Sequence, residues 1–137
     1  MSNSVLWREL TAEDLRAKAA ANAIVVLPVA SMEQHGPHLP VGVDTILCEG
    51  VCKLGAEIAA QDVPVVVAPT LWCGMAEHHM AFGGTFTFEF QLTVPCYSVF
   101  SRASTDMVSN GCSLSMGTGA ILPHSIRSSL TSHAKHA

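Results

Sequence analysis

Two short apolar runs on either side of an amphipathic segment dominate the first half of the chain. Residues 23–29, AIVVLPV, and residues 63–68, VPVVVA, are continuous and rich in β-branched side chains, which is typical of strands buried on both faces of a parallel sheet. Asp44 opens a predicted helix between them, and an earlier helix signal begins at Thr11, with Asp14 as its capping partner. The order predicts a βαβ unit, and therefore an α/β fold with a layered, mostly parallel sheet and flanking helices.

The helix predicted between the two runs has one apolar and one charged face. Its large apolar residues recur at helical spacing, as in a stripe that packs on a core: Leu47, Val51, Leu54 and Ile58. Its opposite face is charged: Glu49, Lys53 and Glu57. Farther along, residues 85–90, TFTFEF, alternate between polar and apolar side chains, which predicts a further, half-buried strand.

The segment between the first strand and this helix is rich in Gly and Pro, so it is predicted to be a loop. It brings together four side chains with metal or acid–base chemistry: Glu33, His35, His38 and Asp44. Because the loop leaves the carboxyl end of a strand, it lies where open α/β sheets place their sites. Glu33 and His35 are two positions apart, so an extended backbone would point both side chains the same way.

These side chains have the chemistry of a metal site. Carboxylate and imidazole donors together suit a borderline divalent ion such as zinc or manganese. The helix dipole favours a carboxylate at Asp44, whose two oxygens can bridge two ions that activate a water for hydrolysis. Two other interpretations stay open. The residues are only turn and cap residues, or Glu33, His35 and His38 bind one zinc ion while Asp44 caps the helix.

Composition narrows the class of protein. The chain has 137 residues, enough for one domain, and a formal net charge of −4 with only 7 Lys and Arg. There is no basic patch, so neither nucleic acid nor a membrane surface is an expected partner. No apolar run has the length of a membrane span, and the N-terminus does not resemble a signal peptide, so a cytoplasmic location is expected. The five cysteines form no CxxC pair and predict reduced thiols.

Two runs resemble the creatininase (creatinine amidohydrolase) family. Residues 28–45, PVASMEQHGPHLPVGVDT, resemble the family signature P-x-G-S-x-E-Q-H-G-P-H-L-P-x-x-x-D, and residues 31–41 hold this pattern without a gap. Residues 74–85, GMAEHHMAFGGT, are similar to the later family pattern G-x-S-x-E-H-x-x-F-P-G-T. Ala30 stands where Gly is common in the family, and Gly83 where Pro is common.

The resemblance implies a site and an activity. Glu33 would ligate one divalent metal, His35 a second, and Asp44 would bridge them, with zinc or manganese as the ions and two ions per subunit. The implied reaction is hydrolysis of a non-peptide or cyclic C–N amide bond in a small-molecule substrate, by a homo-oligomer that is often a hexamer. Three further residues are implied to lie near the site: Glu77, His78 and His79. The general acid and base are not identified.

The pattern of the chain changes after about residue 90. Residues 1–90 are predicted to form the N-terminal part of a single creatininase-like α/β domain, and residues 91–137 an atypical, poorly ordered tail. That tail holds ten serines and one acidic residue, Asp106, and neither a helix nor a strand is legible in it. The later family motif that resembles N-G-H-G-G-N, which supplies another metal-binding His, is missing.

The tail has the properties of an out-of-frame translation. Residues 106–126, DMVSNGCSLSMGTGAILPHSI, permit the reading HGFKRLFVVNGHGGNIAALD when each codon takes the third base of one residue and the first two bases of the next. Met107 with Val108 forces the first Gly of this reading, and Met116 with Gly117 forces the first Gly of its N-G-H-G-G-N motif. We therefore hypothesise a frame-shifted member of the family with weak metal binding and little hydrolysis. The alternatives are a natural Ser-rich tail and a non-catalytic binding or assembly module.

Sequencing the coding DNA across codons 88 to 120 tests the frame-shift hypothesis. One insertion or deletion is expected to restore the N-G-H-G-G-N motif, with its His across the codons of Gly117 and Thr118. The hypothesis fails if no single insertion or deletion does so.

Overall fold

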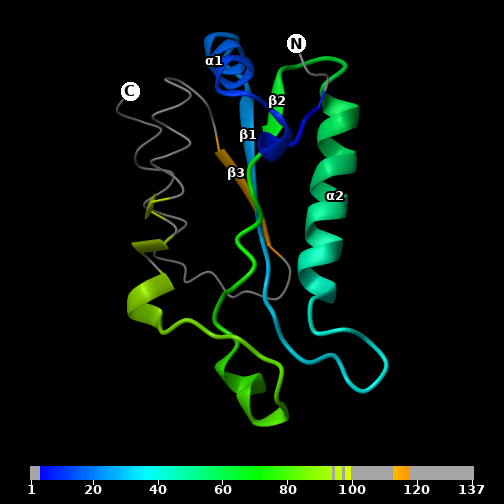
Figure 1. Ribbon diagram of the computed structural model, residues 1–137, viewed down its shortest axis with the longest axis vertical. Coiled ribbons are helices and arrows are strands. Elements are labelled where there is room, and N and C mark those ends of the chain that lie inside the picture. Colours follow the sequence, from blue (N-terminus) through cyan, green and yellow to red (C-terminus); the bar gives the residue numbers. More distant parts are fainter. Residues whose placement is uncertain (1–3, 94, 97, 100–112, 118–137) are drawn as a thin grey trace.

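The computed structural model describes residues 4–93, 95–96, 98–99 and 113–117 (Figure 1). The elements follow one another in this order: η1 (Trp7–Glu9), α1 (Ala12–Ala20), β1 (Ile24–Val29), α2 (Val43–Ala59), β2 (Val65–Val67), η2 (Glu77–Phe82) and β3 (Ser113–Gly117). Both η elements are single stretches of 3₁₀-helix.

The predicted cap starts α1. The Thr11 hydroxyl accepts the backbone N–H of Asp14 at 3.1 Å, and the Asp14 carboxylate accepts the backbone N–H of Thr11 at 3.2 Å. These reciprocal bonds form a capping box, which satisfies two of the donors that a helix start leaves open. The helix ends before Asn22, which takes a positive φ of 55° and turns the chain into β1.

The sheet is parallel and has the strand order β2-β1-β3. Val25 of β1 pairs with Val66 of β2, and the five β1 residues after Ile24 are buried, which confirms the prediction of strands covered on both faces. The segment between β1 and β2 contains α2, so the predicted βαβ unit is confirmed as well.

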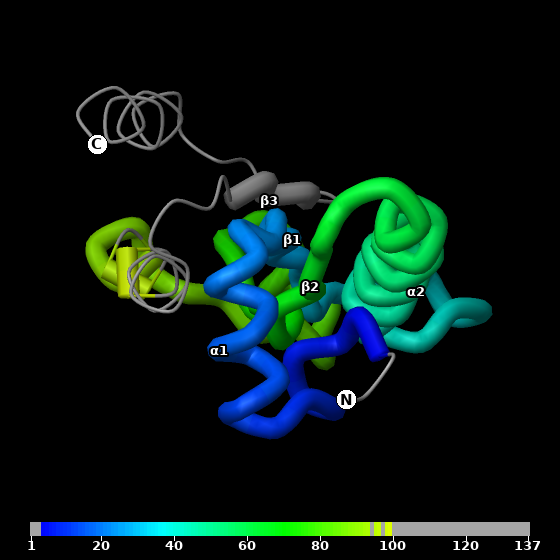
Figure 2. The backbone as a smooth tube through the Cα atoms, turned by 90° about the horizontal axis from the view of Figure 1, so that it is seen from above, coloured from blue at the N-terminus to red at the C-terminus, as the bar shows by residue number. Residues whose placement is uncertain are grey.

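The two helices cover opposite faces of this sheet (Figure 2). Leu15 of α1 packs in one cluster with Val25, Leu27 and Val66. The alternate strand residues belong to a second cluster with the buried face of α2: Val26, Val65 and Val67. Alternation along the strands thus divides the core into two layers, and the carboxyl ends of β1 and β2 lead into the loops at the foot of Figure 1.

The prediction that the large apolar stripe of α2 faces the core is wrong. Its four residues are exposed: Leu47 57%, Val51 58%, Leu54 61% and Ile58 69%. The buried face is made of the smaller residues Cys48, Cys52 and Ala56, which recur every four positions. Small side chains let the helix approach the sheet closely, and the Cys48 thiol donates to the carbonyl oxygen of Val29 at 3.4 Å.

The prediction of a strand at residues 85–90 is also wrong. Phe86 makes one isolated bridge to Met32, and its backbone N–H donates to the Met32 carbonyl at 2.9 Å. The Phe88 N–H donates to the Gly74 carbonyl at 2.9 Å. The backbone bonds of this segment therefore join single loop residues and do not build a ladder, although its polar and apolar side chains alternate.

Part of the tail has regular structure that the sequence did not predict. Residues 90–93, 95–96 and 98–99 are helical. β3 pairs with β1 in parallel, from Val25 against Ser113 to Val29 against Gly117, so this edge of β1 is covered. A strand paired through its backbone needs no β-branched run, which explains why the segment SLSMG gave no signal. The prediction of poor order for the rest of the tail lies outside the described residues.

Two predictions from composition can be compared with the described residues. None of the four cysteines in the described residues is in a disulfide: Cys48, Cys52, Cys73 and Cys96. Burial, together with the neighbouring Cys48, raises the pKa of the Cys52 thiol to about 11, so Cys52 is a poor nucleophile at neutral pH. In the same part of the chain, every helix is too short or too polar to cross a membrane.

A matched pair of substitutions tests which face of α2 is buried. Ala56→Asp places a carboxylate where the side chain is 3% exposed and is expected to lower the free energy of unfolding by at least about 3 kcal/mol, since a buried charge without a partner is costly. Leu54→Asp places the same charge where the side chain is 61% exposed and should cost less than about 1 kcal/mol. Urea unfolding of both variants measures the difference. Equal costs would contradict the observed orientation of α2.

Candidate metal centre

A buried serine joins the two ends of the loop between β1 and α2. Ser31 is 1% exposed, and its hydroxyl donates to Oδ2 of Asp44 at 2.9 Å. In return, the Thr45 hydroxyl donates to the backbone carbonyl of Ser31 at 3.3 Å. Asp44 lies in the first turn of α2, where the helix dipole favours its negative charge. Ser31 therefore holds one oxygen of Asp44 and leaves the other, Oδ1, for a second partner.

That second partner is His35. Its Nε2 lies 3.3 Å from Oδ1 of Asp44, and its Nδ1 lies 2.9 Å from the backbone carbonyl oxygen of Glu33. A carbonyl oxygen can only accept, so Nδ1 carries a proton. Both ring nitrogens thus face oxygens, whereas a neutral imidazole has one N–H. Nε2 is therefore the ring nitrogen that faces Asp44 and that could act as a metal ligand.

Glu33, His35 and Asp44 form one group of metal-ligand atoms. One ligand atom from each residue lies within 4.8 Å of the others. The side chains are partly shielded, with Glu33 12%, Asp44 15% and His35 25% exposed. Such shielding strengthens electrostatic attraction between charged groups. The structure thus brings together the three side chains that the sequence analysis assigned to one site.

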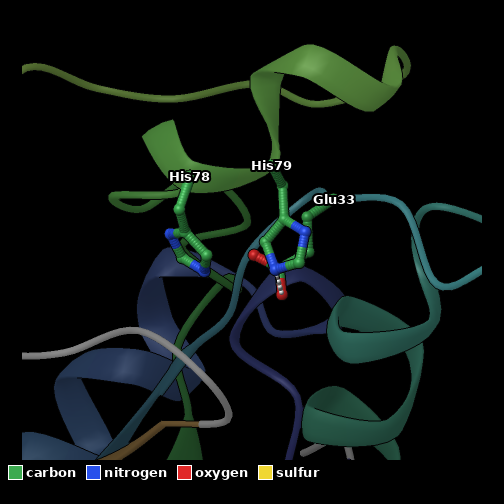
Figure 3. A group of neighbouring side chains, drawn as sticks. All are labelled: Glu33, His78 and His79. Carbon is green, nitrogen blue, oxygen red and sulfur yellow. Dashed lines mark ion pairs between the residues drawn. The ribbon is translucent and has the colours of Figure 1, made fainter.

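Of the other four predicted site residues, two belong to a second ligand group and two do not. His38 and Glu77 are exposed and belong to neither ligand group in the described part of the chain. His78 and His79 come from η2 and form a second group with Glu33, again within 4.8 Å (Figure 3). Nε2 of His79 lies 3.6 Å from Oε1 of Glu33. The two groups therefore share the Glu33 carboxylate.

A cleft of about 520 Å³ adjoins the start of α2. Its lining comes from η1, both loops and α2: Arg8, Met32, Thr45, Glu49, Pro69, Thr70, Trp72 and Phe86. Arg8 and Glu49 pair at 2.6 Å, and this hydrogen bond lowers the pKa of Glu49 below its ordinary value. The rings of Trp72 and Phe86 meet edge to face, 5.5 Å apart. Thr45 brings this cleft beside Asp44, but none of the metal-ligand candidates lines it.

Comparison with known proteins identifies the family of this chain. The family model described as creatininase, creatinine amidohydrolase, matches residues 8–98. The chain belongs to the creatininase family. The match contains the loop with Glu33, His35 and Asp44 and the η2 segment, so both ligand groups lie in the shared region.

The matches to individual relatives cover only part of each relative's length. The creatinine amidohydrolase of Pseudomonas putida is 38% identical over 85 residues, which is 61% of this chain and 31% of that protein. The mycofactocin precursor peptide peptidase of Mycolicibacterium smegmatis is 42% identical over 64 residues, 45% of this chain and 26% of the relative.

The fold also matches solved creatininase structures. A mutant creatininase described as Zn-Zn type is 26% identical and superposes with a TM-score of 0.79, covering 97% of this chain and 52% of that one. A manganese form is among the other matched structures. The chain thus spans about half the length of these structures and shares their α/β layers.

The site shows what sequence reasoning can and cannot find. The grouping of Glu33, His35 and Asp44 follows from a short loop and one strand end. The anchoring role of Ser31 was missed, although a serine two positions before a predicted ligand was a visible signal. The contact between His79 and Glu33 joins residues 46 positions apart in the printed sequence, so no local pattern predicts its geometry.

Proposed function

We propose that this chain carries the metal-binding part of a creatininase-type amidohydrolase, which cleaves a non-peptide or cyclic C–N amide bond with a metal-activated water. One observation carries the proposal: Glu33, His35 and Asp44 present their ligand atoms to one another within 4.8 Å at the carboxyl end of β1. Ligand-binding sites of parallel α/β sheets lie at this end.

The residues present fit a divalent ion. Two carboxylates and one imidazole match the donors that zinc accepts, and Nε2 of His35 is the free ligand atom because Nδ1 is bound to the Glu33 carbonyl. When bound, a divalent ion supplies Lewis acidity towards an amide carbonyl and makes a bound water more acidic.

Each protein group has a defined part in holding that ion. Ser31 fixes the rotamer of Asp44 through Oδ2, so that Oδ1 points to His35. The backbone carbonyl of Glu33 fixes the tautomer and the orientation of the His35 ring. The N-terminus of α2 adds a partial positive charge, which attracts the Asp44 carboxylate. The loop therefore positions its ligands before an ion arrives.

The ions, the substrate and the assembly follow by analogy. Zinc and manganese forms of creatininase share the fold, which supports either ion here, with two per subunit in a complete site. The named relatives act on creatinine and on a precursor peptide, so we propose a small-molecule amide substrate without choosing one. We also propose a homo-oligomer in the cytoplasm, as the family resemblance implies.

The division of the chain is part of the proposal. Residues 1–90 form the N-terminal part of the creatininase-like domain, and residues 91–137 derive from an altered reading frame. The parallel pairing of β3 with β1 is compatible with this, because the motif N-G-H-G-G-N recovered in the other frame overlaps the same residues. In that frame the codon of the additional metal-binding His would span the codons of Gly117 and Thr118, at the end of β3.

Assays of amide hydrolysis test the proposed function. The 137-residue chain, supplied with zinc or manganese, is expected to hydrolyse creatinine and small formamides little or not at all. The protein from a gene with its reading frame restored should hydrolyse one of these small amides, and lose the activity when a chelator removes the metal.

Two substitutions in the restored protein identify the site. Asp44→Ala is expected to lower kcat/KM by at least about 100-fold, since an interaction of several kcal/mol with the metal is lost. The matched change His38→Ala removes an exposed side chain of the same loop and should leave the activity near its starting value. Equal effects of the two changes, or no amide hydrolysis by the metal-loaded restored protein, would refute the proposal.

A further inference from the structure

The second group of ligand atoms has its own geometry. His79 faces Glu33 with Nε2 3.6 Å from Oε1, and one ligand atom of His78 lies within 4.8 Å of both partners. The centroids of the two imidazole rings are 4.2 Å apart, and the rings are tilted by 51°. Figure 3 shows both rings reaching down from η2 towards the Glu33 carboxylate. Two consecutive histidines therefore converge on one carboxylate.

Hydrogen bonds hold η2 in place above Glu33. The Phe86 N–H donates to the carbonyl of Met32, the residue before Glu33. The Thr85 hydroxyl donates to the His79 carbonyl at 3.2 Å, and the Thr87 hydroxyl accepts the Ala76 N–H at 3.0 Å. The turn after η2 uses Gly83 and Gly84 at positive φ of 77° and 70°, where glycine has the lowest strain. The 3₁₀ segment is thus tied to residues 85–87, and Phe86 joins those residues to the loop that carries Glu33.

The His79 ring is also oriented from its far side. The side-chain amide of Gln34 lies 3.3 Å from Nδ1 of His79, and the Oε1 atom of Gln34 accepts the Gly36 N–H at 2.8 Å. This contact keeps Nε2 of His79 turned towards Glu33. Partners that orient the second nitrogen of a histidine are a regular feature of metal sites.

We propose that Glu33, His78 and His79 form a second divalent-cation site that prefers zinc. Two imidazoles and one carboxylate are the donors of open zinc sites, which leave a fourth position for water or a ligand. Tetrahedral bonds of about 2.0–2.1 Å place ligand atoms about 3.4 Å apart. The separation of 3.6 Å between Nε2 of His79 and Oε1 of Glu33 is already close to this value, and rotation of the exposed His78 side chain can bring its ligand atom nearer to both.

The site is separate from the amidohydrolase proposal. It shares Glu33 with the group of His35 and Asp44, and a carboxylate has two oxygens, so one oxygen can serve each site. Zinc can bind here whether or not the chain belongs to an active hydrolase. The imidazole pair selects zinc over magnesium, which prefers oxygen ligands in octahedral geometry.

Histidine modification of the full chain tests the site. Diethyl pyrocarbonate modifies free imidazoles, and peptide mass spectrometry reports each histidine separately. Zinc is expected to abolish the modification of His78 and His79, magnesium is expected to have no effect, and the exposed His38 is the internal control that stays reactive in both. The proposal is overturned if His78 remains as reactive as His38 in the presence of zinc.

Zinc affinity in a chain without the first group gives a second test. His35→Ala with Asp44→Asn leaves Glu33, His78 and His79, and keeps a side-chain oxygen that can accept the Ser31 hydroxyl. This parent is expected to bind about one zinc ion in competition with a chromophoric chelator. Adding His78→Ala or His79→Ala should weaken binding at least about tenfold, since even outer partners of metal ligands contribute roughly 10–100-fold. Adding His38→Ala should change nothing. Unchanged affinity after His79→Ala, or a parent that binds no zinc, would refute the site.

Discussion

The structure depends on the hydrogen bond between Ser31 and Asp44. It joins the end of β1 to the first turn of α2, so the intervening loop leaves and returns at one point. The Glu33 N–H closes the same loop by donating to the Val41 carbonyl at 3.1 Å. A loop closed in this way has lost much of its conformational freedom before any ion binds. Strand, helix start and ligand group thus form one local unit.

This unit needs a rigid base, which the parallel sheet provides. β1 is buried between α1 on one face and α2 on the other, with β2 and β3 on its two edges. The small residues Cys48, Cys52 and Ala56 let α2 lie close to the strands, so the position of Asp44 follows from backbone packing. The large apolar residues of α2 point away from this core. The second ligand group stands on a different support, because η2 is held by side chains and single backbone bonds.

Most of the parallel core and of the first ligand group could be predicted from sequence, because both rest on local signals. β-branched runs mark β1 and β2, the Thr11 capping box marks α1, and Gly and Pro mark the loop. The orientation of α2 could not be predicted, because the large apolar residues such as Leu54 were expected to face the core, whereas small residues such as Cys52 do so. The prediction of a strand at residues 85–90 was wrong because alternating side chains do not supply a partner strand. β3 was not predicted for the opposite reason, because its regular structure comes from pairing with β1 and not from a pattern in its own sequence.

The central claim is that Glu33, His35 and Asp44 hold a divalent ion. A crystal of the full chain grown with zinc, measured on both sides of the zinc absorption edge, tests it directly. We expect an anomalous peak between Nε2 of His35 and Oδ1 of Asp44, at about 2.0–2.2 Å from each ligand atom. Well-ordered side chains at the present separation of 3.3 Å, with no peak between them, would contradict the claim and leave this contact as a salt bridge of the loop.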